Sequence, residues 1–155
     1  MSDDVVGCIA CDINRGRAPL PGGLVHDTAH WRVEHCIGRL GVGTWIVKPK
    51  RHVTGVGDLR DEEAAELGPL LARTSRVAEQ LVDCEQVYNE LWSHAGSPRG
   101  HIHYVIAPVT SEQVARFGKG PNLHAGMFAA EEPLDLDAVE AISERARSIF
   151  SAVDR

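Results

Sequence analysis

His101 and His103 are two residues apart in the segment 100–108, where polar and apolar residues alternate up to Pro108. Successive side chains of a strand point to opposite faces, so the spacing predicts a strand that carries both imidazoles on one face. The β-branched and aromatic residues of the segment favour a strand over a helix. Imidazoles so placed bind metal ions, transfer protons or attack phosphorus. The alternative interpretation is a pair of solvated histidines.

Cys8 and Cys11 form a Cys-x2-Cys pair near the N-terminus. Two thiolates at this spacing reach one tetrahedral ion, as in many zinc sites. A thioredoxin-type redox pair needs a following helix, which residues 14–19 do not continue. A haem attachment needs a histidine after the second cysteine, where this chain has Asp12. Two buried structural thiols remain as an alternative.

Two histidines supply the further ligands that a zinc site needs. His52 ends a basic loop, residues 48–52, that follows an apolar strand and Pro49. With Cys8, Cys11 and His101 it makes a Cys2His2 set, which fills a tetrahedral shell and describes a structural zinc without an open position. The three cations of the loop are a candidate anion contact or an ordinary solvated surface.

His103 is then left free to act. A neutral imidazole attacks phosphorus and forms a phosphoramidate, which water or an alcohol breaks. Its other ring nitrogen needs an acceptor that fixes the tautomer. A different interpretation takes His101 and His103 as ligands of one catalytic metal, because His-x-His on a strand can hold an ion in this way.

Composition limits the function classes. The 155 residues are 43% hydrophobic and 25% charged, which indicates one globular domain over residues 1–155. A net charge of −6 argues against a nucleic-acid surface but leaves room for a small phosphorylated ligand. No apolar run is long enough to span a bilayer, and the acidic start does not resemble a signal peptide. We therefore expect a cytoplasmic protein with reduced thiols.

The elements that must position these residues are readable from periodicity. We expect short strands at 24–26, 31–35, 43–48 and 87–92 in addition to the histidine strand, and helices at 58–82 and 135–153. Pro69 predicts a bend or a break in the first helix. The Gly- and Pro-rich segment 110–130 is expected to be irregular, as a lid or a dimer element. A short connection, 93–100, predicts an antiparallel hairpin into the histidine strand.

Taken together, these blocks resemble the histidine triad (HIT) superfamily of nucleotidyl hydrolases and transferases, and the resemblance covers nearly the whole chain. The matching parts are Cys-Ile-Ala-Cys, the strand-to-loop segment 47–52, the acidic-led helix, and the strand 101–108. Their order is similar to that of the zinc-carrying bacterial members. In that subgroup zinc is held by the positions that correspond here to Cys8, Cys11, His52 and His101.

The triad itself departs from the motif of the superfamily. That motif is His-x-His-x-His, and its middle histidine attacks the α-phosphorus. The resemblance assigns this catalytic role to His103, and the third position is then Val105, which has no hydrogen-bond donor. Loss of one such donor commonly costs about 10²–10³ in rate. The alternative register takes His101 as the middle residue and removes the fourth zinc ligand.

The resemblance also implies contacts to a nucleotide. An Asn on the strand before the triad corresponds to Asn89, and a phosphate-contacting hydroxyl corresponds to Ser97. Arg99, His94 or Lys50 are candidates for the missing positive charge, with Arg99 next to the triad.

The sequence thus predicts an α+β protein with a HIT-like fold, a mostly antiparallel sheet of about five strands and two main helices. The function implied by the resemblance is cleavage of a P–O–P or P–N bond of a nucleotide through a histidyl-nucleotide intermediate, with zinc as a structural cofactor. The alternative is a nucleotide-binding or regulatory protein with weak or no catalysis, because Val105 replaces a histidine. The expected partners are a small nucleotide and a second copy of the chain, with no nucleic acid and no membrane.

Overall fold

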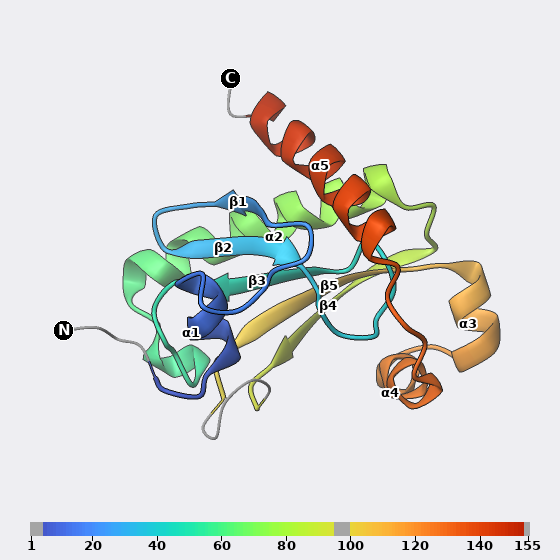
Figure 1. Cartoon of the computed structure of the whole chain (residues 1–155), viewed down its shortest axis with the longest axis horizontal. Helices are drawn as coiled ribbons and strands as arrows, with labels where there is room; N and C mark the ends of the chain where they lie inside the picture. The colour runs from blue at the N-terminus through green and yellow to red at the C-terminus, as the bar shows by residue number, and fades with distance from the viewer. Residues whose placement is uncertain (1–4, 95–99, 154–155) are drawn as a thin grey trace.

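The computed structural model describes residues 5–94 and 100–153. Its centre is a five-stranded sheet in the order β1-β2-β3-β5-β4, in which every neighbouring pair is antiparallel (Figure 1). The strands are β1 (Leu24–Asp27), β2 (Trp31–His35), β3 (Trp45–Pro49), β4 (Gln86–Trp92) and β5 (His103–Val109). The predicted α+β class and antiparallel sheet are confirmed.

Five α-helices surround the sheet, together with a short 3-10 turn, η1 (Val56–Asp58). They are α1 (Ile9–Asn14), α2 (Asp61–Leu81), α3 (Ser111–Phe117), α4 (Pro121–Ala130) and α5 (Leu136–Val153). The two long helices, α2 and α5, are the predicted ones, and α2 continues through Pro69 as one helix. None of the helices in the described part of the chain is long and apolar enough to cross a membrane.

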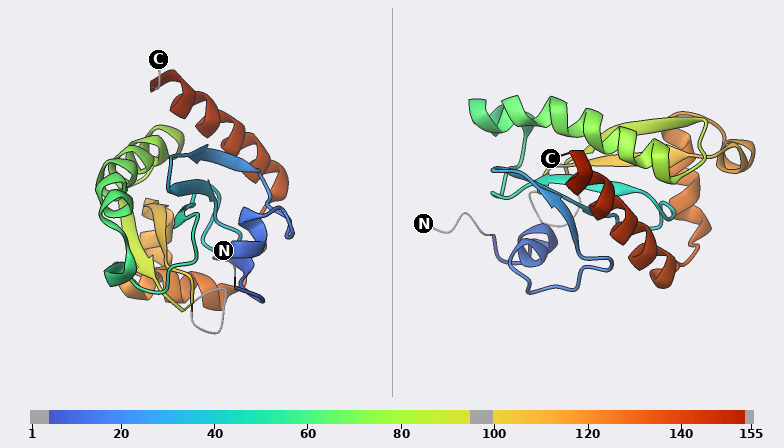
Figure 2. Two further views of the ribbon diagram at one scale, coloured as in Figure 1. Left: turned by 90° about the vertical axis from the view of Figure 1, so that its left-hand side faces the viewer. Right: turned by 90° about the horizontal axis from the view of Figure 1, so that it is seen from above.

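Each face of the sheet has its own apolar core. α2 and α5 lie over one face of the sheet (Figure 2). Side chains of that face such as Trp31, Val47 and Ile106 belong to one apolar core with residues of the two helices. On the other face, Val105 and Ala107 pack against residues of α4. Side chains along β5 therefore alternate between the two faces of the sheet, as predicted. Tyr104 and Ile106 face α2, and the odd-numbered residues from His103 onward face the opposite side, where α4 lies.

The segment 110–130 is not irregular, as the sequence predicted, but forms α3 and α4. Thr110 caps α3 through a reciprocal pair of hydrogen bonds: its Oγ1 accepts from the backbone N–H of Gln113 at 3.2 Å, and its own N–H donates to Gln113 Oε1 at 2.9 Å. Two of the three glycines of the segment lie at the helix boundaries, Gly118 at the end of α3 and Gly120 before α4, and Gly126 lies inside α4. The prediction gave the glycines more weight than the capping box.

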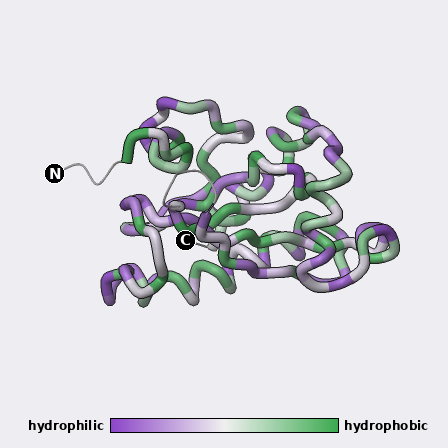
Figure 3. The backbone as a smooth tube through the Cα atoms, turned by 90° about the horizontal axis from the view of Figure 1, so that it is seen from below, coloured by the Kyte–Doolittle hydropathy of each residue, from purple (hydrophilic) through white to green (hydrophobic). Residues whose placement is uncertain are grey.

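The chain approaches α1 through a hydrophobic stretch that lies at the surface. Figure 3 shows this stretch in green next to the N-terminal end, and Val6 and Ile9 within it are exposed. α1 itself is a short helix whose other residues turn inward, with Ala10, Cys11 and Ile13 buried. It lies beside the ends of β3 and β5, where the predicted ligands are found.

Candidate functional site

The four predicted ligands come together in one cluster. Cys8, Cys11, His52 and His101 each offer one ligand atom, and these atoms all lie within 4.8 Å of one another. Cys8 precedes the first residue of α1 and Cys11 lies in its first turn, so the three-residue spacing puts both thiols on one side of the helix. Both cysteines and His101 are fully buried, which makes a closed cluster rather than a surface one.

The distances within the cluster fit a tetrahedral ion. The Nδ1 atom of His101 lies 3.5 Å from Cys8 Sγ and 3.7 Å from Cys11 Sγ, and His52 Nδ1 lies 3.4 Å from Cys11 Sγ. Zinc bonds of about 2.3 Å to sulfur and about 2.0 Å to nitrogen at tetrahedral angles separate S and N by about 3.6 Å. The donor set and its spacing are therefore those of a zinc site.

The tautomer of His101 agrees with this role. Its Nε2 atom lies 3.2 Å from the carbonyl oxygen of Pro49, which can only accept, so the proton is on Nε2 and the lone pair is on Nδ1. Burial lowers the pKa of His101 to about 4, and burial also lowers the pKa of His52. Both rings are thus neutral near pH 7, as metal ligands must be. A backbone carbonyl on the other ring nitrogen is the usual support for a metal-binding histidine.

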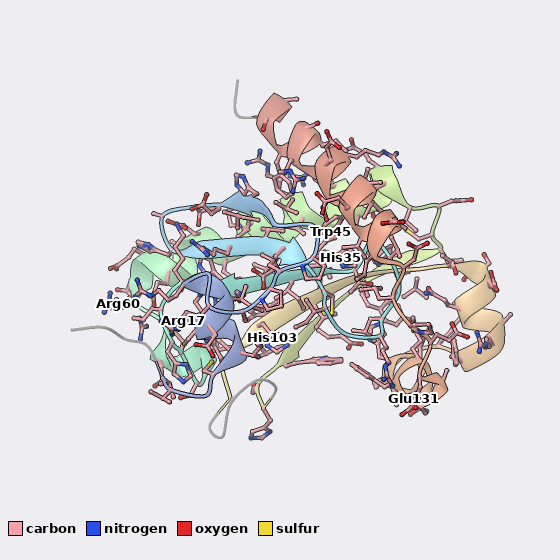
Figure 4. The ribbon with its side chains drawn as sticks, viewed as in Figure 1. Arg17, His35, Trp45, Arg60, His103 and Glu131 are labelled. Carbon is pink, nitrogen blue, oxygen red and sulfur yellow. The ribbon has the colours of Figure 1, made fainter. Side chains whose placement is uncertain are left out.

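His103, the first residue of β5, lies outside this cluster. His101 precedes the strand, so the prediction that one strand carries both imidazoles was wrong. Its Nδ1 atom donates to the carbonyl oxygen of His101 at 3.0 Å, which leaves the lone pair on Nε2. Burial lowers the pKa of His103, and the nearby Lys48 lowers it further. The ring makes an edge contact with Trp92 at a centroid distance of 6.2 Å. The imidazole of His103 is therefore neutral and held in one orientation. Figure 4 labels His103.

His103 lines a mostly apolar pocket of about 200 Å³. One wall comes from α1, one from the loop after β2, and another from Trp92 and Phe128; the apolar lining residues are Ile9, Ala10, Ile13, Cys36, Ile37, Ile46, Trp92, Val105 and Phe128. The helix that carries two cysteines of the cluster thus also forms a wall of the pocket. The integrity of the cluster and the shape of the pocket depend on the same short helix.

A buried ion pair interrupts this apolar lining. Lys48 Nζ donates to Glu34 Oε1, and the exposed fractions of the two side chains are 2% and 4%. Ile46 of β3 is paired with Val105 of β5, and Val47 with Tyr104. Continuing this register by one residue places Lys48 opposite His103. Burial raises the pKa of Glu34 and lowers the pKa of Lys48, while their mutual attraction opposes both shifts.

The basic loop after β3 is not an open anion site. Each of the three cations that the sequence assigned to this loop is paired with a carboxylate of the protein: Lys48, which lies in β3, with Glu34, Lys50 with Asp27 at 2.7 Å, and Arg51 with Glu63 at 2.7 Å. The alternative of an anion contact at this loop, raised from the sequence, is not supported. The pairs instead fix the loop that carries the Pro49 carbonyl and His52.

Comparison with known proteins rests on structure, because no family model and no curated protein matches this chain. A hypothetical histidine triad nucleotide-binding protein from Sulfolobus tokodaii aligns with a TM-score of 0.70 and 18% identity, covering 96% of this chain and 95% of that one. The chain has the histidine triad fold.

Two further structures extend the comparison. A Zn-bound histidine triad family protein from Mycobacterium smegmatis aligns with a TM-score of 0.61 and 19% identity over 92% of this chain and 96% of that one. A hypothetical protein from Leishmania major shares 32% identity over 68% of this chain and 74% of that one, with a TM-score of 0.54. The histidine triad fold predicted from the sequence is confirmed.

Val105, the residue that the sequence resemblance assigned to the third triad position, is surrounded by apolar side chains. Val105 is fully buried and packs in a cluster with Cys36, Leu40, Leu123 and Met127. The last two belong to α4, which the sequence did not predict. The apolar side chain of Val105 is therefore covered by other apolar side chains.

Of the predicted nucleotide contacts, Asn89 lies within the described residues, and it does not line the pocket. Asn89 pairs with Ile106 across β4 and β5 and so lies on the α2 face, where its Nδ2 donates to Ser75 Oγ at 3.1 Å. This prediction was wrong, since the side chain is on the opposite side of the sheet from His103. Ser97 and Arg99 lie outside the described residues.

Sequence reasoning missed the pocket residues Glu34, Trp92 and Phe128, and it took Lys48 for a cation of the basic loop rather than a pocket residue. A signal existed for Lys48, because it lies between Val47 and Pro49 in a strand with a buried face. Trp92 ends β4 opposite His103, and its ring lies 5.4 Å from that of Phe128 of α4 in a tilted arrangement. Their convergence depends on strand register and on a helix that was not predicted.

Proposed function

We propose that this protein binds a nucleotide in the His103 pocket and cleaves a P–O–P or P–N bond at its α-phosphorus. The observation that carries the proposal is the state of His103: a neutral ring whose Nδ1–H is held by a carbonyl and whose Nε2 lone pair is free, in the lining of an apolar pocket. The histidine triad fold adds support, as does the nucleotide-binding protein from Sulfolobus tokodaii that shares it.

In the proposed reaction, the Nε2 lone pair of His103 attacks the α-phosphorus. The bond from phosphorus to the leaving group breaks, and the leaving group departs with that electron pair and gains a proton from solvent. Water then attacks the histidyl-nucleotide, the P–N bond breaks with its electron pair returning to Nε2, and the water gives up a proton to solvent. A nucleoside monophosphate is released and neutral His103 is regenerated. The carbonyl of His101 stabilises the positive ring of the intermediate by accepting its Nδ1–H.

A zinc ion has a separate, structural place in this proposal. Cys8, Cys11, His52 and His101 would hold it, and four protein ligands leave no coordination position for a substrate. When bound, the ion would cross-link α1, the loop after β3 and the segment just before β5. Within the described residues His103 is not one of the four residues whose ligand atoms cluster, so the geometry does not favour a catalytic metal shared by His101 and His103.

A second candidate function is nucleotide binding without efficient turnover. The observation that favours it is Val105, whose buried apolar side chain offers no donor to the phosphate or the leaving group. Loss of such a donor commonly costs about 10²–10³ in rate, which leaves slow turnover or none.

Intact-protein mass spectrometry during turnover of an adenosine phosphoramidate separates the two candidates. We expect a nucleotidyl adduct and released AMP with the zinc-loaded protein, and neither with His103→Ala. The matched control is His30→Ala, a histidine of the β1–β2 loop that is ion-paired with Glu66 at 3.8 Å and is not among the pocket residues. A bound nucleotide without adduct or AMP would support the binding protein instead.

The second partner, another copy of the chain, is also part of the proposal. Sedimentation velocity at micromolar concentration measures it directly, and a species of one chain mass at all concentrations would contradict it.

A further inference from the structure

We propose that Glu34 determines which ligands the His103 pocket accepts, by taking a hydrogen bond from an N–H group on the edge of a nucleobase. The inference rests on the proposed nucleotide binding and adds a selectivity to it. It starts from one unusual atom, the second carboxylate oxygen of Glu34.

This oxygen is buried without a partner. Glu34 is 3% exposed, and while Oε1 accepts from Lys48, Oε2 has no hydrogen-bond partner within the described chain. A buried polar group left unsatisfied destabilises the protein, so a ligand that supplies a donor recovers that free energy on binding. A ligand that lacks the donor does not.

The position of Glu34 places the carboxylate at the pocket. Glu34 is paired with Ile46, which is paired with Val105, so the three form one row across β2, β3 and β5. All three line the pocket together with His103. The remaining lining is almost entirely apolar, and in such surroundings a hydrogen bond to a charged acceptor is stronger than in water.

The chemistry of the pair indicates a base rather than a phosphate. A carboxylate repels a phosphate, whose place in the proposed reaction is at Nε2 of His103. Beside the acceptor of Glu34, the ammonium of Lys48 carries N–H donors. The edges of nucleobases present an N–H next to an acceptor atom, as the 6-amino group and N1 of adenine do. An apolar slot with an acceptor and a donor at its floor complements such a flat, mixed edge.

Ribose hydroxyls are donors too, and the test separates the two sources. Isothermal titration calorimetry compares AMP with purine riboside 5′-monophosphate, which lacks only the 6-amino group, and with 2′,3′-dideoxyadenosine 5′-monophosphate, which lacks only the hydroxyls. We expect the loss of the amino group to weaken binding about 10- to 100-fold and the loss of the hydroxyls to weaken it less.

A double variant assigns the selectivity to the ion pair. Glu34→Met with Lys48→Met removes both charges together, which leaves no unpaired buried ion and is often tolerated. We expect its preference for AMP over purine riboside 5′-monophosphate to fall to about twofold or less. The matched control is Asp27→Asn with Lys50→Met, which removes an ion pair outside the pocket and keeps the preference.

The outcomes are distinct. Equal binding of AMP and purine riboside 5′-monophosphate by the unaltered protein overturns the inference and leaves the proposed function standing. A loss confined to the dideoxy compound assigns the acceptor to ribose and also overturns it. Binding of none of the three nucleotides overturns both proposals. These comparisons use the unaltered protein, so they decide the question even if the double variant fails to fold.

Discussion

The Nδ1 atom of His103 lies 3.0 Å from the carbonyl oxygen of His101, and the ring of His101 points away into the cysteine cluster. One short stretch of backbone thus separates two imidazoles with different tasks. In His101 the free lone pair is on Nδ1 and faces two sulfurs; in His103 it is on Nε2 and lines the pocket. The hydrogen-bonding carbonyl decides the tautomer in each case.

Replacing Val105 by histidine tests whether the missing triad donor limits the reaction. We expect Val105→His to raise turnover of an adenosine phosphoramidate about tenfold or more. We also expect it to lower stability by about 1–3 kcal/mol, because the larger polar ring enters an apolar cluster that is fully buried. Steady-state kinetics and urea unfolding measure the two effects. Val105→Thr, similar in shape but without an imidazole, should lose stability and gain no turnover.

Disrupting the cysteine cluster should weaken ligand binding as well as stability. α1 carries Cys8 and Cys11 on one side and contributes Ile9, Ala10 and Ile13 to the pocket. We expect Cys11→Ser to lower zinc content, melting temperature and AMP affinity together, measured by elemental analysis, calorimetry and titration. Cys84→Ser, which alters a thiol outside the cluster, is the control. Unchanged AMP affinity in a zinc-free protein would contradict the link between α1 and the pocket.

We expect the folded protein to lose stability in mild acid because of the buried side chain of His35. Its Nδ1 donates to the Cys36 carbonyl at 2.8 Å and its Nε2 accepts the N–H of Gly43 at 2.8 Å. The second bond needs the neutral ring, because a protonated ring has no lone pair on Nε2. Figure 4 labels His35. Burial lowers the pKa of His35 below its ordinary 6.5. The unfolded chain then binds the proton more readily, so this stabilisation is complete above pH 6.5 and is lost as the pH falls below it.

Urea unfolding from about pH 8 to about pH 5 measures this dependence. The slope of unfolding free energy against pH should be smaller for His35→Gln, which cannot titrate, than for the unaltered protein. An identical slope in His35→Gln would show that other groups account for the acid sensitivity.

The ion pair between Arg51 and Glu63 should stabilise the loop that carries His52. Arg51 donates to both carboxylate oxygens, at 3.0 and 2.7 Å, and the backbone N–H of Arg60 donates to the same carboxylate at 2.8 Å. The hydrogen bond from Arg51 is the main cause of a Glu63 pKa of about 2. We expect Glu63→Gln to lower the free energy of unfolding by about 1–3 kcal/mol at pH 7.

The companion variant for this prediction is Glu62→Gln, an exposed residue in the same helical turn that should change stability little. Chemical unfolding gives the free energies, and a competition assay with a zinc-binding dye gives the metal affinity. Zinc affinity should fall with Glu63→Gln and not with Glu62→Gln. Equal stability of the two variants would mean that Arg51 does not fix the loop.

The local chemistry of this protein was readable in its sequence. The three-residue spacing of Cys8 and Cys11 follows from the geometry of one helical turn, and the alternation from His103 onward follows from that of a strand, so neither needs tertiary information. That β5 begins only at His103, after His101, was not readable. The long helices were equally clear, because their apolar stripes repeat at 3.6 residues. The four residues of the cluster were identified from types and spacing, and the structure brings their ligand atoms within 4.8 Å.

What only the tertiary structure decided is which faces meet. The alternation of side chains along β4 shows that Asn89 and Leu91 share one face of the strand. Only the pairing of β4 with β5 shows that this face lies toward α2 and away from His103. The same register, and not any local pattern, brings Glu34 and Lys48 to the floor of the pocket. A sequence specifies the period of each element, whereas cross-strand register and helix packing are set by the burial of the whole chain.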